Sequence, residues 1–268
     1  MEKLGEFKGL VAVVTGGGSG MGKATALLLA ERGAQVMIAG RRADMLDAVT
    51  KEAAARGLDV RGTVADVASA ADVSRLFEAT RAGFGGVDIL VTAAGAITSG
   101  SIMDADEAEW DRVVDVNLKG VYLPSRHAIA EMRRRGGGAI VHVASMHAFA
   151  STKGRAVYAA TKAGVVGLTR AMALDHAADN IRVNAVCPGA VDTDFLRSGW
   201  AALNPGKPLE PLLAELGAKH PAGRIGRPED VAEVIAFLAS PRASFLTGEA
   251  YPVEGGVLAR LSIAPQVR

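Results

Sequence analysis

The fold is decided by residues 10–22, Leu10-Val11-Ala12-Val13-Val14-Thr15-Gly16-Gly17-Gly18-Ser19-Gly20-Met21-Gly22. The apolar, β-branched run that ends at Thr15 predicts a buried parallel strand, and a helix-compatible segment begins at Lys23. A strand, a glycine turn and a helix start form an anion-binding site, because free backbone N–H groups and the helix dipole point at the ligand. The glycines also let the backbone approach a pyrophosphate closely.

The glycine turn fits two nucleotide-binding motifs incompletely. Its spacing is Gly16-x-x-x-Gly20-x-Gly22, which differs from the standard dinucleotide spacing G-x-G-x-x-G. The P-loop pattern holds up to Lys23 but breaks at Ala24, where a serine or threonine must ligate magnesium. The sequence therefore disfavours a nucleoside triphosphatase.

Strand-like and helix-like segments alternate along the rest of the chain. This alternation predicts an α/β fold with a doubly wound parallel sheet. The chain has 268 residues with no repeat and no linker, so we expect a single dinucleotide-binding and catalytic domain over residues 1–268. The expected strands lie near residues 35–40, 59–64, 87–91, 138–145, 181–186 and 249–253, and the expected helices near 43–56, 69–84, 106–135, from 158 to about 178, and 228–240.

Residues 194–226 break this regular pattern. The segment loses its periodicity and gathers Pro205, Pro208, Pro211 and Pro221. An excursion this long in a compact domain predicts a substrate lid or a binding loop.

Composition excludes several classes of protein. A net charge of +1 gives no case for nucleic acid binding. The basic run Arg133-Arg134-Arg135 is interpreted as a solvated helix end that complements the helix dipole, in preference to a site for an acidic partner. One cysteine, Cys187, excludes an internal disulfide framework and a cysteine-cluster metal site, and we expect it to be a small core residue.

No segment of the sequence indicates a membrane. The first five residues carry no apolar signal region, and no run of about 18 uncharged apolar residues occurs anywhere. We therefore expect a soluble, cytoplasmic protein.

The end of the second expected strand bears on cofactor choice. NAD-type sites usually place an acidic residue about 20 residues past the glycines, where it binds the ribose 2′-hydroxyl. This chain has Gly40 there, followed by Arg41 and Arg42. An arginine that faces a 2′-phosphate favours NADP(H), with NAD(H) as the alternative. The competing interpretation is a pair of solvated arginines that open the next helix.

The stretch Tyr158-Ala159-Ala160-Thr161-Lys162 carries the expected chemistry. Positions i and i+4 of a helix share one face, so the Tyr158 phenol and the Lys162 ammonium are neighbours. A strand that ends at Ser145 precedes this helix. A tyrosine has an ordinary pKa near 10, and a close cation lowers it. Taken alone, the pattern also fits a half-exposed tyrosine and a solvated lysine.

Two polar residues have open interpretations. Asn117 lies midway in the expected helix 106–135, where asparagine is unfavourable, which indicates a local distortion, a water site, or a side chain that satisfies buried backbone groups. Asp66 follows the third expected strand, and it either caps the next helix or accepts a hydrogen bond from an adenine amino group.

These residues together resemble the short-chain dehydrogenase/reductase (SDR) family, and the resemblance covers Leu10 to about Gly256. Agreement at this many positions is far more specific than any single motif. The matching positions are Thr15-Gly16-x-x-x-Gly20-x-Gly22, Asp66, Asn117, Ser145, Tyr158, Lys162, Pro188-Gly189-x-Val191-x-Thr193, Thr247-Gly248 and Gly255-Gly256.

The resemblance implies a Rossmann-type oxidoreductase, a homotetramer, and roles for four catalytic residues. Tyr158 would be the general acid/base, and Lys162 would lower its pKa and hold the nicotinamide ribose. Ser145 would hydrogen-bond the substrate oxygen, and Asn117 would anchor a water chain to solvent. The residues implied to bind the cofactor are Gly16, Ser19, Gly20, Met21, Gly22, Arg41, Asp66, Val67, Ala93, Ala94, Gly95, Tyr158, Lys162, Pro188, Gly189, Val191 and Thr193. No metal is implied.

The sequence departs from the family pattern at three places. The usual Asn-(Asn/Ala)-Ala-Gly turn is Thr92-Ala93-Ala94-Gly95 here, Glu254 replaces a common aspartate, and position 19 is serine where some NADP-binding members carry a basic residue. The first departure bears on the support beneath the cofactor, and the third weakens the NADP(H) prediction.

The predicted function is hydride transfer between nicotinamide and the carbon of a small-molecule secondary alcohol or ketone. An NADPH-dependent carbonyl reductase of the 3-oxoacyl or small-ketone type is favoured. The alternatives are an NAD-dependent polyol, sugar or steroid dehydrogenase and a non-catalytic, cofactor-binding scaffold. A serine hydrolase using Ser145, His147 and Asp192 is disfavoured, because Ser145 lacks the flanking glycines of a nucleophile elbow.

Overall fold

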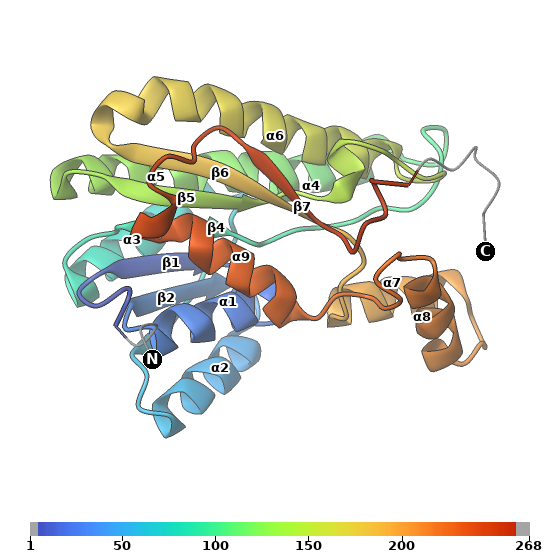
Figure 1. The fold of residues 1–268 in the computed structure, drawn as a ribbon, viewed down its shortest axis with the longest axis horizontal. Helices are drawn as coiled ribbons and strands as arrows, with labels where there is room; N and C mark the ends of the chain where they lie inside the picture. Colours follow the sequence, from blue (N-terminus) through green and yellow to red (C-terminus); the bar gives the residue numbers. More distant parts are fainter. Residues whose placement is uncertain (1–4, 261–268) are drawn as a thin grey trace.

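Seven strands form one parallel sheet in the computed structural model, which describes residues 5–260 (Figure 1). The strand order is β3-β2-β1-β4-β5-β6-β7, so the order reverses between β1 and β4. The predicted doubly wound sheet is confirmed. The strands are β1 (Val11–Thr15), β2 (Gln35–Gly40), β3 (Val60–Val64), β4 (Ile89–Thr92), β5 (Gly138–Val143), β6 (Ile181–Pro188) and β7 (Ala250–Val253).

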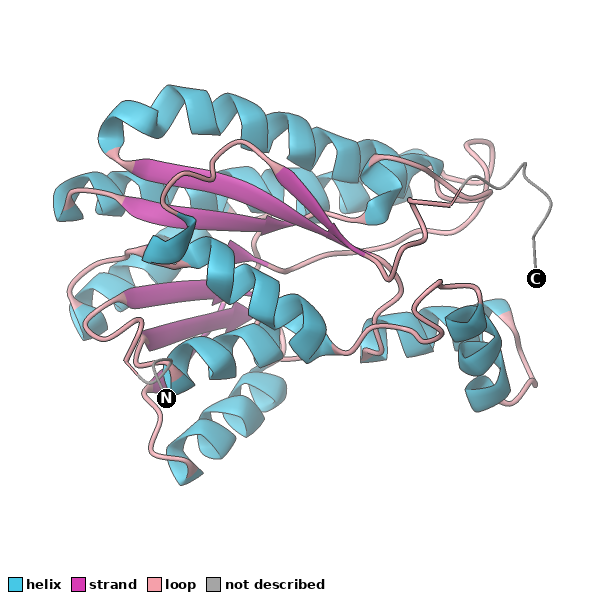
Figure 2. Ribbon diagram, in the orientation of Figure 1, coloured by secondary structure: helices cyan, strands magenta, loops and turns pink. Residues whose placement is uncertain are grey.

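Helices cover both faces of this sheet (Figure 2). One face packs against α1 (Gly20–Glu31), α2 (Ala43–Ala55) and α9 (Pro228–Ala239). The other packs against α3 (Ala70–Phe84), α5 (Gly120–Arg135) and α6 (Ala156–His176), with α4 (Glu107–Val114) beside α6. Short helical turns cover Asp115–Lys119, Met146–Ala148, Ala177–Asp179 and Pro241–Ala243.

Alternation along β1 shows how the sheet divides the core. Ala12 and Val14 pack into the cluster that contains α1, α2 and α9, whereas Val13 packs into the cluster that contains α3 and α5. Successive strand side chains point to opposite faces, so a strand that is buried on both faces must be apolar throughout. All five residues of β1 are buried, which explains its continuous apolar run.

The buried carboxylate of Asp88 fixes the start of the central strand. Its Oδ2 accepts a hydrogen bond of 2.8 Å from the Val11 backbone N–H, and its Oδ1 accepts one of 2.5 Å from Arg135 Nε. The neighbouring arginines also pair internally, Arg133 with Asp179 and Arg134 with Glu131. The basic run therefore serves the fold at the end of α5 instead of offering three unpaired cations to a partner.

Residues 194–226 contain two helices that the sequence pattern did not reveal. These are α7 (Asp194–Leu203) and α8 (Leu209–Ala218), and they project from the body of the molecule beyond the sheet (Figure 1). Pro208 and Pro211 lie at the N-cap and in the first turn of α8, where a missing N–H removes no helical hydrogen bond. The apolar residues of α7 do have an amphipathic spacing, so a usable signal was present in the sequence although none of these residues is fully buried.

Two expectations from composition can be compared with the described residues. Cys187 is fully buried, as predicted. Between residues 5 and 260, no helix combines the length and apolar character needed to cross a membrane. The absence of a signal region among the first residues was a prediction that concerns residues 1–4, which lie outside the described part.

We expect Asp88→Ala to lower the free energy of unfolding by about 3 kcal/mol, because it leaves the buried Val11 N–H without an acceptor and breaks the Arg135 pair. Asp59→Ala is the matched control, since the Asp59 carboxylate is exposed and pairs with an exposed Arg61. That change should cost less than about 0.5 kcal/mol. Urea unfolding measures both, and equal losses would contradict an anchoring role for Asp88.

Candidate active site

The glycine turn after β1 packs against the ends of other strands. A Cβ on Gly16 would lie 2.6 Å from the Ala94 backbone nitrogen, and φ at Gly16 is +69°. A Cβ on Gly20 would lie 2.9 Å from Thr193 Cγ2, and one on Gly22 would lie 2.3 Å from the Gly16 carbonyl oxygen. Close contacts within the protein therefore already require glycine at these positions. The same contacts bring the ends of β1, β4 and β6 together.

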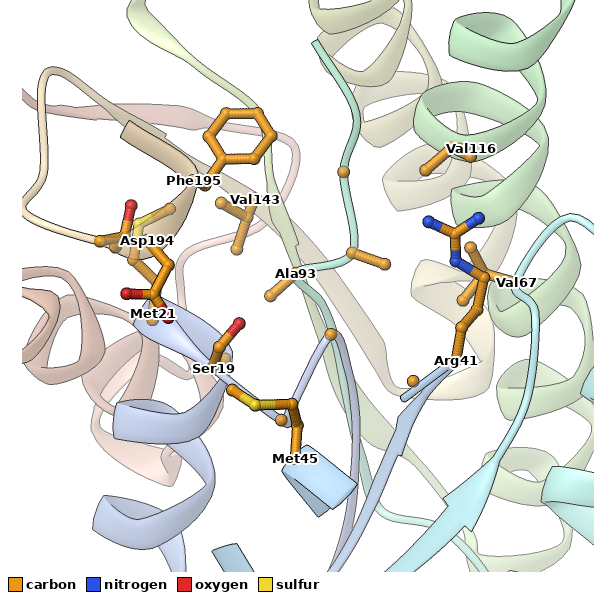
Figure 3. A pocket seen from close by; sticks show the side chains of 18 of the residues that line it. Ser19, Met21, Arg41, Met45, Val67, Ala93, Val116, Val143, Asp194 and Phe195 are labelled. Carbon is orange, nitrogen blue, oxygen red and sulfur yellow. The ribbon is translucent and has the colours of Figure 1, made fainter. Parts of the chain in front are cut away.

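A cavity of about 400 Å³ opens at this junction, a size typical of small-molecule sites. It is lined at the carboxyl ends of consecutive strands, where open parallel sheets bind ligands. Figure 3 shows the Arg41 and Val67 side chains on one side of the cavity and Asp194 and Phe195 on the other, with Ala93 between them.

Most of the residues predicted to bind a cofactor line this cavity. They are Gly16, Ser19, Gly20, Met21, Gly22, Arg41, Asp66, Val67, Ala93, Ala94, Gly95, Tyr158, Lys162 and Thr193. The lining does not include Asn117, Ser145, Pro188, Gly189 or Val191. It also contains residues that motif reasoning missed, and these are Gly18, Gly40, Arg42, Met45, Leu46, Ala65, Val116, Val143, Ala144, Asp194, Phe195 and Ser198.

Several of the missed residues had a usable signal. Gly40, Ala65 and Val143 each end or directly follow a strand, so their position at the carboxyl edge follows from the strand prediction. Asp194 and Phe195 lie in α7, a helix that was not predicted, but they belong to the segment 194–226 that the sequence predicted to be a lid or binding loop.

Asp66 does not cap the following helix. Its Oδ1 accepts a hydrogen bond of 2.9 Å from the Ala68 N–H, which closes a turn after β3. The N-cap of α3 is Ser69, whose hydroxyl accepts from the Asp72 N–H. The capping alternative is therefore wrong, and the Asp66 carboxylate lines the cavity instead.

Tyr158, Lys162 and Ser145 lie together, as their spacing predicted. The Lys162 Nζ is 5.8 Å from the centre of the Tyr158 ring, and all three side chains are buried. Ser145 lies two residues beyond the end of β5, and its hydroxyl is close enough to the phenol to lower the pKa of Tyr158. The alternative of a half-exposed tyrosine and a solvated lysine is wrong, because Tyr158 is 9% and Lys162 is 4% exposed.

The expected lowering of the Tyr158 pKa by Lys162 is not observed. Burial raises the pKa of the Tyr158 phenol above its ordinary value, although the Ser145 hydrogen bond and the charge of Arg155 act in the opposite direction. The phenol is therefore protonated at neutral pH, as a proton donor must be. Sequence spacing showed the neighbouring cation but gave no measure of the desolvation that opposes it.

Lys162 is a buried cation with hydrogen-bonding capacity left over. Burial lowers its pKa to about 8, so it is charged at neutral pH. Its Nζ donates one hydrogen bond, 2.8 Å long, to the Val143 carbonyl oxygen, and an ammonium group has three N–H donors. A Cβ on Gly95 would lie 3.8 Å from this Nζ, which is an ordinary van der Waals distance, so Gly95 borders the ammonium.

Asn117 lies in a local distortion of the helix, as its poor helical propensity indicated. Residues Asp115–Lys119 form a π-helical turn between α4 and α5. The Asn117 Oδ1 accepts from the Ala96 N–H at 2.7 Å, and its Nδ2 donates to the Ala96 carbonyl at 2.8 Å and to Thr161 Oγ1 at 3.0 Å. Asn117 thereby ties the turn after β4 to α6, and one Oδ1 lone pair remains for a water.

A buried pair supports the unusual turn that begins at Thr92. The Thr92 Oγ1 lies 2.9 Å from His142 Nδ1 on the adjacent strand β5, and both residues are buried. Burial and the nearby charge of Lys162 lower the pKa of His142 to about 3. A neutral histidine therefore supports the turn from the adjacent strand. In the family pattern, an asparagine on the turn itself stands where this chain has Thr92.

The residues after β6 have structural partners of their own. A Cβ on Gly189 would lie 2.8 Å from Glu254 Cβ, and the Thr193 hydroxyl caps α7 by accepting from the Leu196 N–H. Asp192 is held by Arg197 through bonds of 2.6 and 2.9 Å. Because Asp192 pairs with Arg197, it does not orient His147, and the arrangement that a serine hydrolase requires is not formed.

The fold and the cavity together define a dinucleotide-binding protein of the Rossmann type. A parallel sheet whose order reverses between β1 and β4 carries, at that point, a glycine turn that opens a helix. The cavity lies over the carboxyl ends of the strands, and a buried ammonium with unused donors faces it.

Comparison with known proteins agrees with this class. Residues 16–258 match the family model described as enoyl-(acyl-carrier-protein) reductase. The chain is 44% identical over 260 residues to cis-4-hydroxycyclohexanecarboxylate dehydrogenase of Sinomonas cyclohexanicum, covering 96% of this chain and 100% of that protein. It is 39% identical over 252 residues to dehydrogenase/reductase SDR family member 4 of Oryctolagus cuniculus, covering 94% of each chain.

A solved structure gives the same result. A variant of actinorhodin polyketide ketoreductase with NADPH superposes with a TM-score of 0.89 at 34% identity, covering 95% of this chain and 98% of that one. The chain belongs to the short-chain dehydrogenase/reductase family, as its motifs predicted.

The buried His142 predicts a specific pH dependence of stability. Its pKa is about 3 in the folded protein and near 6.5 when unfolded, so its contribution is complete above pH 6.5 and is lost as the pH falls towards 3. Within that window the stabilisation falls by about 1.4 kcal/mol per pH unit. In urea unfolding between pH 6 and pH 4, we expect His142→Asn to show a shallower decline than the unaltered protein. Parallel declines would contradict a buried neutral His142.

Proposed function

We propose that the protein is an NAD(P)-dependent oxidoreductase that transfers a hydride between nicotinamide and the carbon of a secondary alcohol or ketone. The observation that carries this proposal is the buried group of Ser145, Tyr158 and Lys162 at the carboxyl edge of β5, beside the cavity. Family membership supports the same reaction class.

The residues that line the cavity fit a dinucleotide. The N-terminus of α1 would hold the pyrophosphate, and the unused donors of Lys162 would hold the ribose hydroxyls. Gly95 borders that ammonium. The carboxylate of Asp66 has one oxygen that is not used in its own turn, and this oxygen can accept from an adenine amino group.

Side chains of the protein transfer the proton in this reaction. Bound nicotinamide supplies or accepts the hydride. Tyr158 donates its phenol proton to the substrate carbonyl oxygen during reduction and accepts the hydroxyl proton during oxidation. Ser145 hydrogen-bonds the same oxygen and holds it against the phenol, while the Lys162 cation beside them stabilises negative charge that develops on either oxygen.

NADP(H) is the favoured cofactor. Arg41 directly follows β2 and lies on the same side of the cavity as Val67, and Arg42 also lines the cavity. Neither arginine forms an ion pair within residues 5–260, so both guanidinium groups are available to a 2′-phosphate. The protonated state of Tyr158 suits reduction, which is consistent with NADPH as the donor.

The substrates that we propose form a narrower class than secondary alcohols in general. The Sinomonas relative is named for a ring alcohol that carries a carboxylate, and that compound is a reasoned first substrate for this chain. We further propose that α7 and α8 form a lid, since Asp194, Phe195 and Ser198 of α7 line the cavity. The exposed Leu174 and Phe245 side chains support assembly, which we propose to be a homotetramer.

Tyr158→Phe should lower kcat/KM by about 10³-fold or more, because it removes the proton donor and acceptor. The ring that packs beside Lys162 and His147 is retained, so folding and cofactor affinity should not change. Steady-state turnover with a ketone, together with NADPH fluorescence titration, measures both effects. Turnover within tenfold of the unaltered protein would remove Tyr158 from the mechanism.

Arg41→Ala should raise the Kd for NADPH by about 10- to 100-fold, because it removes a cation from the 2′-phosphate, and it should leave the Kd for NADH nearly unchanged. Fluorescence titration with each cofactor provides the measurement. The control is Arg81→Ala, which removes an exposed arginine in the last turn of α3 that pairs with Glu131. Tighter binding of NADH than of NADPH by the unaltered protein would show that NAD(H) is the cofactor.

A further inference from the structure

An arginine with no acidic partner lies next to the reacting group. Arg155 begins α6 three residues before Tyr158, and it is partly buried. Residues three apart at a helix start lie on neighbouring positions of one face. The Arg155 carbonyl oxygen accepts a hydrogen bond of 2.8 Å from the Ala159 N–H, so residue 155 closes the first turn of the helix that carries Tyr158. Its charge acts on both the Tyr158 phenol and the His147 ring.

Arg155 is held in place by neutral groups. Its Nη1 donates to the Thr98 carbonyl at 3.0 Å and to the Ser99 hydroxyl, and the backbone of residue 155 pairs with Gly100. The nearest part of that loop does carry a carboxylate, Asp104, but its Oδ2 accepts from the Ser101 N–H and hydroxyl at 2.6 and 2.7 Å.

The guanidinium group therefore keeps both charge and donors available. Its Nε and Nη2 have no hydrogen-bond partner within residues 5–260, and no ion pair in that range includes Arg155. A positive charge at a helix N-terminus also meets the positive end of the helix dipole, which is unfavourable for folding unless an anion is bound.

A second polar group near the phenol lacks a partner. The Nδ1 atom of His147 is buried and makes no hydrogen bond in the described part of the chain. Its ring contacts the Tyr158 ring edge-on, with ring centres 5.8 Å apart. Burial, followed by the charge of Arg155, lowers the pKa of His147, so the ring is neutral at neutral pH. An unpaired buried polar atom is costly, and a polar group on a ligand would satisfy it.

We propose that Arg155 binds a carboxylate of the substrate, so that the protein acts on hydroxy or oxo acids whose reacting carbon lies at Tyr158. This inference rests on the proposed function. The planar fork of Nε and Nη2 matches the two oxygens of a carboxylate, and a partly buried position strengthens such a pair. His147, whose ring contacts that of Tyr158, would form one hydrogen bond with the substrate, as acceptor or donor according to its tautomer.

The competing explanation gives Arg155 a purely structural role. Through Thr98 and Ser99 it would only fasten the loop after β4 to the start of α6. A structural role predicts that a change at Arg155 harms every substrate equally. Recognition of a carboxylate predicts a loss that is much larger for acidic ligands than for neutral ones.

The test compares an acidic ring alcohol with a neutral one. Kinetic constants for oxidation of cis-4-hydroxycyclohexanecarboxylate and of cyclohexanol are measured for the unaltered protein, Arg155→Gln and Arg155→Lys. We expect Arg155→Gln to lower the ratio of kcat/KM for the acid to kcat/KM for cyclohexanol by about 30-fold or more, because loss of the charge near Tyr158 affects both substrates whereas loss of carboxylate binding affects the acid alone. Arg155→Lys should recover part of the loss. Arg170→Gln is the matched control, because it removes an exposed cation from the same helix and should change neither substrate.

Binding provides an independent readout. Calorimetric titration of the NADP⁺-loaded protein with cyclohexanecarboxylate, which lacks the reacting hydroxyl, should show binding that Arg155→Gln abolishes. No binding to the unaltered protein, or equal losses for the acid and cyclohexanol, would overturn the inference. Cyclohexanol turnover without carboxylate binding would overturn the inference and leave the proposed function standing, whereas carboxylate binding without turnover of any alcohol would overturn both, because the inference assigns that carboxylate to a substrate.

Discussion

The close contact between the Gly16 turn and the end of β4 is the constraint on which the site depends. No Cβ fits between Gly16 and the Ala93–Ala94 backbone, so β1 and β4 can end side by side only with glycine at that position. Because the strand order reverses between these two strands, the same contact forms the floor of the cavity. Asn117 then holds the following turn through Ala96, and Thr161 connects it to the helix that carries Tyr158 and Lys162.

The sequence predicted the parts of the fold that alternate regularly, because burial on both sheet faces imposes apolar runs on strands such as Gln35–Gly40. It did not predict α7 and α8, because the prolines in and around these short helices resemble loop residues, although α7 is amphipathic and α8 buries Leu213. Asn117 is an intermediate case. The unfavourable residue indicated a distortion, but only the three-dimensional structure showed that its amide satisfies the backbone of residue 96.

The sequence predicted which residues form the candidate site better than it predicted the directions of their pKa shifts. Motif spacing brought Ser145, Tyr158 and Lys162 together correctly, because i and i+4 positions and strand ends have fixed geometry. The direction of the Tyr158 pKa was not predictable, since it depends on the balance between burial and nearby charge. His142 illustrates the same limit, because nothing in the apolar run around it indicated a neutral imidazole bonded to Thr92.

The arrangement of the segment after β6 affects how the substrate range of such a protein can change. Arg197 links Asp192 at the start of the segment to Glu210 in α8, and α7 buries no residue against the sheet. The segment packs partly against itself and is joined to the rest of the chain by the Val191–Gly226 bridge and by a hydrogen bond from the Ala222 N–H to the Gly255 carbonyl, while its first turn forms one wall of the cavity. Residues of this segment can therefore vary, or be exchanged between relatives. Such changes would alter which molecules enter the cavity without disturbing the packing of the sheet and its helices on which folding depends.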